Sequence, residues 1–316
     1  MGDVLAGIHS TWEFDTDSVL IRFERGIRTP RLLQVLGERR IPYEALSTVD
    51  LAPGRRKGTV VLHAVPRRGA DPLFDAAGGQ LREAADPYRL VLPAERENLA
   101  GYYATELRSA LGPPAGEEAA AYLVAAPPAP PAFKAYDGKV AFDGKEVSFR
   151  WFWTAASSAK WKAGDQAFRV SELAGVEWRS PEVSVGHLRL LRDGAGDGHG
   201  HGEGGGGEET ADQDPASVVL GRGYGPVHES LPLAAAVLEA IRAAEPDEDD
   251  HDPRGGHDRR GQHGQHGQHG QPGRNGHRAD PADIADRIRH LGDLHTAGLL
   301  TDQEFTAKKT ELLAEL

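Results

Sequence analysis

The chain has 316 residues, which is enough for two or three small domains. Hydrophobic residues make up 39% of it, while 39 glycines and 21 prolines are present, so we expect part of the chain to stay outside any packed core. A net charge of −12 argues against general nucleic-acid binding, and the absence of cysteine excludes disulfides, thiol catalysis and thiolate metal sites.

The N-terminal stretch MGDVLAGIHSTWEF has neither a basic start nor an apolar core of signal-peptide length. The longest uncharged stretch, residues 119–133, is too short to span a bilayer and contains four prolines. We therefore expect a soluble, cytoplasmic protein in which residues 1–10 are a leader.

The first repeat unit is predicted at residues 11–112. In FDTDSVLIRF, which starts at Phe14, Val19, Ile21 and Phe23 alternate with other residues, the pattern of a half-buried strand. TVVLHAV and YRLVL follow the same pattern, with PGRRKG as a turn between strands. The stretch ENLAGYYATELRSAL predicts a closing helix. Its apolar stripe is Leu99, Tyr103, Leu107 and Leu111.

A second copy of this unit is predicted at residues 133–244. FDGKEVSFRW starts 128 residues after FDTDSVLIRF, and VSELAGVEW, GHLRL and DPASVVL repeat YEALSTVDL, GTVVL and DPYRLVL at offsets of 127 or 128. Four matched blocks in one order indicate a tandem duplication. The second unit also ends in a predicted helix, whose stripe contains Leu233, Val237 and Ile241.

Each unit is predicted to contain several antiparallel strands followed by one helix, which gives an α+β fold. A small bent sheet or partial barrel closed by a C-terminal helix is the outline of a pleckstrin-homology-like fold. On its FD opening, its L..V middle block and its terminal helix, the pair of units resembles an actinobacterial family known as domain of unknown function 4429. This resemblance covers most of residues 11–244 and implies no activity.

Low-complexity stretches separate these parts. Residues 113–132 form an Ala/Pro linker whose proline-rich end predicts a stiff, extended spacer. A Gly-rich loop at 193–214 and an acidic, His- and Gly-rich tether at 245–279 are predicted to be disordered, because they lack residues that could build a core.

Residues 280–316 predict a helical hairpin. Asp280 and Pro281 start the first helix, and Thr301 with Glu304 forms a capping box for the second. The pattern L…H.AGLLT..EF..KK..LL resembles a SHOCT domain, which implies oligomerisation or partner contact. So small a hairpin would gain stability by docking on another copy or on a partner. The predicted contact residues are Ile288, Leu291, Leu294, Leu299, Leu300, Phe305 and Leu312.

The repeated Gln-His-Gly triplets place His263, His266 and His269 on the tether. Imidazoles on a flexible chain bind nickel, copper or zinc to some degree, but a specific site needs a fixed geometry. The favoured interpretation is a spacer, with a metal-binding tract as the alternative.

Basic residues gather in the first unit, where 15 Lys and Arg nearly balance 14 Asp and Glu. The loop that contains Arg55, Arg56 and Lys57 could hold an anionic headgroup, but the second copy lacks this triplet. A solvated surface is favoured, and membrane-surface binding is the alternative. The other arginines of the group are Arg22, Arg25, Arg28, Arg31, Arg39 and Arg40.

No Ser-His-Asp set or carboxylate pair stands out in the sequence. We therefore expect a non-catalytic protein without a cofactor and without a nucleic-acid partner. Its function is predicted to be binding or scaffolding, through a rigid platform of two units and a tethered hairpin that self-associates or docks on a protein partner.

Overall fold

The computed structural model describes residues 3–182, 184–192, 211–222 and 227–244, together with Thr306, Lys309 and Thr310. The chain divides into two compact units, Met1–Asp247 and Glu248–Leu316. In the second unit the three described residues are helical, and the Thr310 hydroxyl donates to the Thr306 carbonyl at 2.8 Å. The remainder of the predicted hairpin and the whole of tract 245–279 lie outside the described residues.

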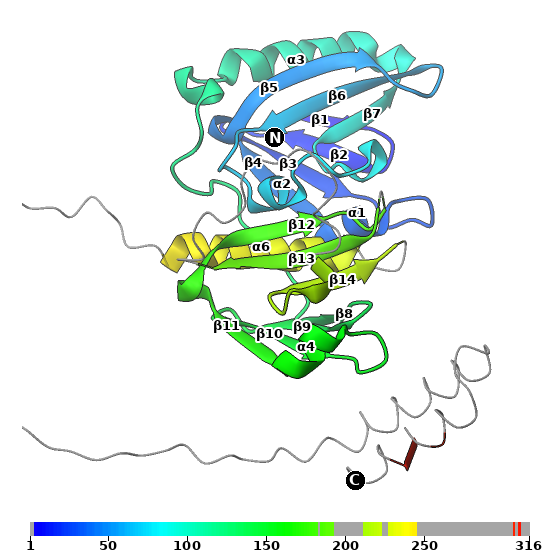
Figure 1. The fold of residues 1–316 in the computed structure, drawn as a ribbon. Helices are drawn as coiled ribbons and strands as arrows, with labels where there is room; N and C mark the ends of the chain where they lie inside the picture. The colour runs from blue at the N-terminus through cyan, green and yellow to red at the C-terminus, as the bar shows by residue number, and fades with distance from the viewer. Residues whose placement is uncertain are drawn as a thin grey trace, which may run out of the picture. The chain divides into compact units, whose positions relative to one another are not determined.

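The first half of unit one is built from two antiparallel sheets, one of four strands and one of three, in the orders β1-β2-β3-β4 and β5-β6-β7 (Figure 1). The strands of the first sheet are β1 (Asp3–Ala6), β2 (Ser10–Phe14), β3 (Ser18–Phe23) and β4 (Glu38–Pro42). Those of the second are β5 (Leu46–Pro53), β6 (Thr59–Pro66) and β7 (Arg89–Pro93). The helices are α1 (Arg31–Leu36), α2 (Pro72–Ala77) and α3 (Glu97–Ala110).

The second half repeats this order of elements, with sheets β11-β10-β9-β8 and β12-β13-β14. The strands of the first of these sheets are β8 (Ala132–Lys134), β9 (Gly138–Phe142), β10 (Glu146–Trp151) and β11 (Gln166–Arg169). Those of the second are β12 (Leu173–Arg179), β13 (Gly186–Arg192) and β14 (Ser217–Gly221). The helices are α4 (Ser158–Ala163) and α6 (Val227–Ala244), and residues 211–213 are also helical.

The predicted α+β class with antiparallel strands is confirmed. The turn PGRRKG does connect two paired strands, β5 and β6. One assignment needs correction: part of the supposed leader, residues 1–10, is strand β1, and Leu5 is fully buried. This strand has a single buried side chain, so it shows no alternation that could be read from the sequence.

The stripe predicted for α3 is also partly wrong. Tyr103 and Leu107 are buried, but Leu99 is 43% exposed. The positions that face the sheet instead include Ala100 and Ala104, both at 0% exposure. Small residues let the helix backbone approach the strands closely. Ala100 and Ala104 therefore face the sheet, although neither belongs to the predicted apolar stripe.

The predicted linker packs against the first half. The amides of Ala119 and Val124, both buried, donate to the carbonyls of Arg68 and Ala70 at 2.8 and 3.0 Å. Gly69 lies beneath this segment at a φ of +74°, where an added Cβ would lie 2.6 Å from the Ala119 carbonyl oxygen. The chain between the halves is therefore fixed by backbone hydrogen bonds along part of its length.

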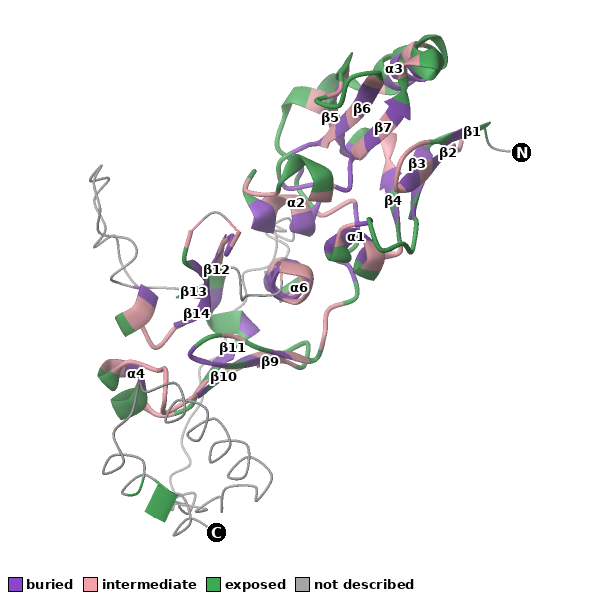
Figure 2. Cartoon of the chain, turned by 90° about the vertical axis from the view of Figure 1, so that its right-hand side faces the viewer, coloured by how far each residue is buried: buried purple, intermediate pink, exposed green. Residues whose placement is uncertain are grey.

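Helix α6 packs against β12 of its own half and against α1 and α2 of the first half. Every residue from 227 to 242 is buried or half-buried, whereas α3 exposes its outer face (Figure 2). A helix covered on all sides is a core element. The two halves therefore share part of one core.

Candidate functional site

A buried ionic cluster joins the two sheets of the first half. The Arg39 guanidinium, on β4, donates to the Asp71 carboxylate at 2.8 Å and to the Tyr88 hydroxyl at 3.0 Å. The Tyr88 hydroxyl donates in turn to the other Asp71 oxygen. Arg39 also donates to the carbonyl of Ala125, in the linker, at 3.3 Å. One cluster thus ties together a strand, a helix start and the linker.

The sequence explains the location of Asp71. It is the N-cap of α2, and its carboxylate accepts from the Leu73 amide at 2.9 Å, with Pro72 as the first helical residue. Burial alone would lower the pKa of Arg39, but the charges and hydrogen bonds of Tyr88 and Asp71 raise it above its usual value. Burial raises the pKa of Tyr88 well above its usual value, so the phenol stays protonated.

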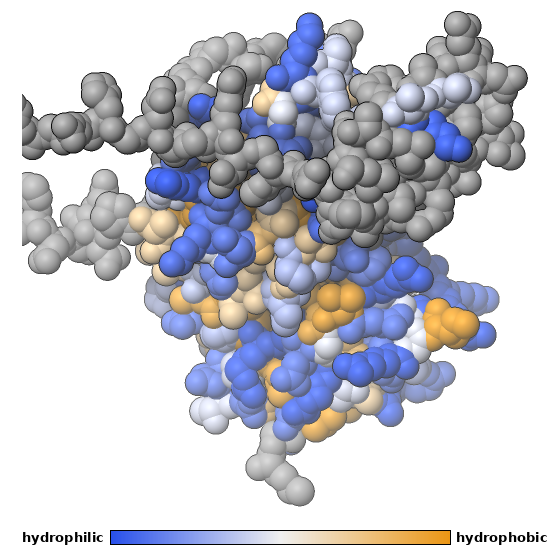
Figure 3. Space-filling view, turned by 90° about the horizontal axis from the view of Figure 1, so that it is seen from below, coloured by the Kyte–Doolittle hydropathy of each residue, from blue (hydrophilic) through white to orange (hydrophobic). Residues whose placement is uncertain are grey.

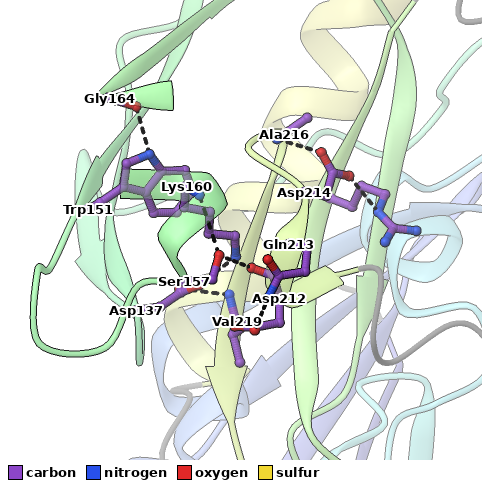
Figure 4. Close-up of polar contacts among 11 residues, drawn as sticks. Asp137, Trp151, Ser157, Lys160, Gly164, Asp212, Gln213, Asp214, Ala216 and Val219 are labelled. Atoms are coloured by element: carbon purple, nitrogen blue, oxygen red, sulfur yellow. Dashed lines mark hydrogen bonds and ion pairs between the residues drawn. The ribbon is translucent and has the colours of Figure 1, made fainter. Parts of the chain in front are cut away.

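The second half has a different buried pair at a different place. The Lys160 ammonium, on α4, donates to the Asp137 carboxylate at 2.6 Å, and both side chains have 0% exposure (Figure 4). Lys160 also lies 5.0 Å from the ring centroid of Trp151, within cation–π range. The second Asp137 oxygen accepts from the Val219 amide, on β14, at 2.9 Å. Burial raises the pKa of Asp137, although Lys160 lowers it in part.

Around this pair, further contacts fix the short segment that precedes β14. Ser157 caps α4 and donates to the Asp212 carbonyl at 2.8 Å (Figure 4). Asp214 accepts from the Ala216 amide at 2.8 Å and lies 3.1 Å from Arg189. The Trp151 indole donates to the Gly164 carbonyl at 2.8 Å. The arrangement joins α4, β10 and β14, so its polar atoms serve to hold elements together.

Neither buried cluster is predicted by the sequence. The positions that match Asp137 and Lys160 in the first half, at offsets of 128 and 127, are His9 and Leu33. Comparing the two copies therefore gives no signal for an ion pair. A lysine that stands between alanine and tryptophan was the one local hint.

A polar seam joins the two halves. The Gln80 side chain donates to the Trp178 carbonyl and accepts from the Ser180 amide, both at 3.0 Å. Arg242, on α6, donates to the carbonyls of Gly69 and Ala119 at 2.9 and 3.0 Å. These contacts lie beside the apolar surface of α6, so the interface between the halves has an apolar core and a polar rim.

The basic turn lies between β5 and β6, as the sequence predicts. Arg55, Arg56 and Lys57 are exposed, and Arg55 is 3.1 Å from the Glu83 carboxylate. Part of the charge that would attract an anion is thus neutralised by a neighbour.

The other predicted sites belong to the tether and the hairpin. His263, His266 and His269 lie outside the described residues, as do the hairpin residues Ile288, Leu291, Leu294, Leu299, Leu300, Phe305 and Leu312. Within the described ranges, no group of three His, Asp or Glu side chains could hold a metal ion. Among these same residues, no helix is long and apolar enough to cross a membrane.

The fold and its repeated element order define an α+β protein made from two copies of one strand-rich domain. Residues 12–108 and 140–238 each match the family described as domain of unknown function (DUF4429). The chain belongs to this family and carries its domain in tandem. No curated protein matches the chain.

Proposed function

We propose that the protein is a non-catalytic binding scaffold. In this proposal each family domain is pleckstrin-homology-like, the two domains form one rigid platform, and a SHOCT-like hairpin at 280–316 mediates self-association or docking. In each half a four-stranded sheet is followed in the chain by a three-stranded sheet and then by a C-terminal helix. This order supports a pleckstrin-homology-like fold for each domain.

Shared burial of α6 is the observation that carries the rigid platform. If the halves moved independently, one face of α6 would be exposed to water, and exposing its apolar residues would reduce the stability of the fold. Instead Leu231, Ala234 and Ala235 are at 0% exposure together with Leu233 and Val237. A platform of this kind holds its surfaces in a fixed relation, which suits a scaffold.

The face of the platform seen in Figure 3 supports a docking role for the hairpin in this proposal. On the face seen in Figure 3, hydrophobic residues form small separate groups among hydrophilic ones. A mixed surface offers little apolar area for strong docking. The sequence of residues 280–316, by contrast, predicts a hairpin with two apolar stripes in 37 residues, which would have little core of its own.

Light scattering coupled to size-exclusion chromatography tests the proposal. We expect the full chain to run as a dimer or larger, and a chain truncated after Ala279 to run as a monomer. Leu291→Asp with Leu294→Asp should reproduce the truncation. Arg289→Asp, which lies off the apolar stripe, is the matched control and should leave the mass unchanged.

A pull-down from native cells gives the second readout, because the hairpin could dock on a different protein. The full chain should retain a partner that the truncated chain loses. The proposal is overturned if truncation changes neither the mass nor the set of bound proteins. Binding would then belong to the tandem domains alone.

A further inference from the structure

The connection between β3 and α1 exposes an aliphatic residue among arginines. Ile27 has a relative exposure of 103%, the highest of the exposed large hydrophobic side chains in the described ranges. Arg25, Arg28 and Arg31 are exposed on either side of it, with Glu24 as the one acidic residue between β3 and α1. We call residues 24–31 the Ile27 loop.

Hydrogen bonds hold this loop in one shape. The Thr29 amide donates to the Gly26 carbonyl at 3.0 Å, so Ile27 and Arg28 occupy the two central positions of a tight turn. The Gln34 side chain, on α1, donates to the carbonyls of Gly26 and Thr29 at 3.0 and 2.7 Å. Both ends of the turn are fixed, and the Ile27 side chain stays in water.

His9 holds the loop from the other side. Its carbonyl accepts from the Glu24 amide at 2.9 Å, and its ring nitrogen Nδ1 lies 3.2 Å from the Thr29 hydroxyl. Among the described residues, His9 is the one non-glycine residue with a positive φ, at 71°. Backbone strain of this kind persists where the surrounding structure enforces it and is common at functional sites. Here the hydrogen bonds of His9 to Glu24 and Thr29 hold a loop at whose tip the Ile27 side chain is fully exposed.

The charge of the loop is not neutralised. In the first half, Arg22 pairs with Glu13, Arg40 with Asp15 and Arg55 with Glu83, whereas Arg56 on the β5–β6 turn forms no ion pair among the described residues. Arg25, Arg28 and Arg31 form no ion pair with any residue in the described ranges, in a chain of net charge −12. The matching connection of the second half, residues 152–157, contains no arginine, so the fold itself does not require these charges.

We infer that the Ile27 loop docks the protein on an anionic bilayer surface, with the arginines on lipid phosphates and Ile27 among the acyl chains. Guanidinium groups bind phosphate oxygens in pairs of hydrogen bonds, and basic residues near an anionic leaflet are attracted to it. A convex tip offers no groove for a peptide, and an aliphatic side chain adds nothing to a nucleic-acid phosphate contact. This inference does not depend on the hairpin.

Vesicle sedimentation of the full chain tests this inference. Wild type should bind vesicles of phosphatidylglycerol and phosphatidylcholine, in a salt-sensitive way, and should not bind pure phosphatidylcholine. Arg25→Glu with Arg28→Glu should weaken binding by about a hundredfold or more. Ile27→Ser should weaken it by about tenfold. Arg55→Glu with Arg56→Glu makes the same charge change on the β5–β6 turn and should have little effect.

A fluorescent label locates the contact directly. The chain has no cysteine, so Ile27→Cys and Lys57→Cys each carry one environment-sensitive fluorophore. With phosphatidylglycerol vesicles, emission from position 27 should shift to the blue and emission from position 57 should not. The inference is overturned if wild type does not bind these vesicles, if both labels respond alike, or if polyglutamate or an oligonucleotide of equal charge gives the same blue shift at position 27.

Discussion

The two C-terminal helices of the tandem domains occupy equivalent places in the chain and have different surroundings. Helix α3 buries one stripe against β5, β6 and β7 and leaves its outer face in water, whereas every residue of α6 up to Arg242 is buried or half-buried (Figure 2). Their basic residues differ in the same way. Arg108 on α3 donates to Val49 of its own sheet at 2.8 Å, while Arg242 on α6 donates to two carbonyls of the preceding segments.

This difference shows how a tandem repeat becomes one structure. The first domain keeps a helix suited to a free surface, and the second has a helix whose outer face is also apolar. The outer face of α3 is exposed at Thr105 and Glu106, and Leu99 and Tyr102 on the same helix are 43% and 55% exposed. The helix sequences therefore record which surface of each domain is inside the protein.

The largest expected effect comes from placing a charge on the shared side of α6. Ala235 has 0% exposure, and helical spacing puts it on the same side as Glu239 and Arg242, which both contact the chain before β8. Ala235→Asp buries an unpaired carboxylate, so we expect it to lower the free energy of unfolding by about 3–5 kcal/mol. Urea denaturation followed by circular dichroism measures this loss.

Thr105→Asp on α3 is the matched control. Thr105 is exposed, so the same aspartate should change stability by no more than about 0.5 kcal/mol. Equal losses for the two variants would contradict the comparison of the helices, because they would mean that α6 is no more enclosed than α3.

An intermediate effect is expected from the two arginines. Arg242→Met keeps the aliphatic stem but leaves the carbonyls of Gly69 and Ala119 without their donor, which we expect to cost about 2 kcal/mol. Arg108→Met removes one hydrogen bond at a more exposed place and should cost about 1 kcal/mol or less. The same denaturation assay compares the unfolding free energies of the two variants. A larger loss of stability for Arg108→Met would contradict the assignment of α6, and not α3, to the interface between the halves.

Much of this fold could be predicted from local pattern. The alternation in VLIRF and VSFRW marks β3 and β10, and turn residues mark the β5–β6 connection. The stretch LPLAAAVLEAI contains one charged residue, Glu239, and its apolar residues lie on more than one face, which signals an enclosed helix. The predicted stripe of Leu233, Val237 and Ile241 describes one of these faces.

The rest depends on contacts between residues far apart in sequence. Arg39 meets Asp71 and Tyr88, and Lys160 meets Asp137, in pairings that no spacing rule specifies. The two halves join their sheets through different buried residues. Comparing the two copies of the repeat therefore does not predict either cluster. The arginines of the Ile27 loop were visible in the sequence as part of a basic group, but only their missing ion pairs separate them from Arg22, Arg39 and Arg40.

The smallest expected effect is a pH dependence on the sheet that supports α6. On β12, a Glu177 carboxylate oxygen lies 3.3 Å from Nε2 of the buried His187. This neighbour is the main reason that the pKa of Glu177 falls from 4.5 to about 2, and Arg189 and Arg179 contribute further. Because the folded pKa lies below the unfolded one, ionised Glu177 stabilises the fold fully above about pH 5, and this stabilisation disappears as the pH falls toward 2. The side chain is 36% exposed, so solvent screening reduces the contribution to on the order of 1 kcal/mol.

Glu177→Gln removes this titration and so isolates it from the other carboxyl groups. The difference in unfolding free energy between wild type and Glu177→Gln should be constant above about pH 5 and should shrink as the pH falls through the window between 4.5 and about 2. Asp50→Asn is the control from the first half, since Asp50 holds the matching position on β5, at an offset of 127, and is exposed. If both variants gave the same pH profile, the lowered pKa would be a general effect of charge, and the sheet beneath α6 would be no more specialised electrostatically than the sheet beneath α3.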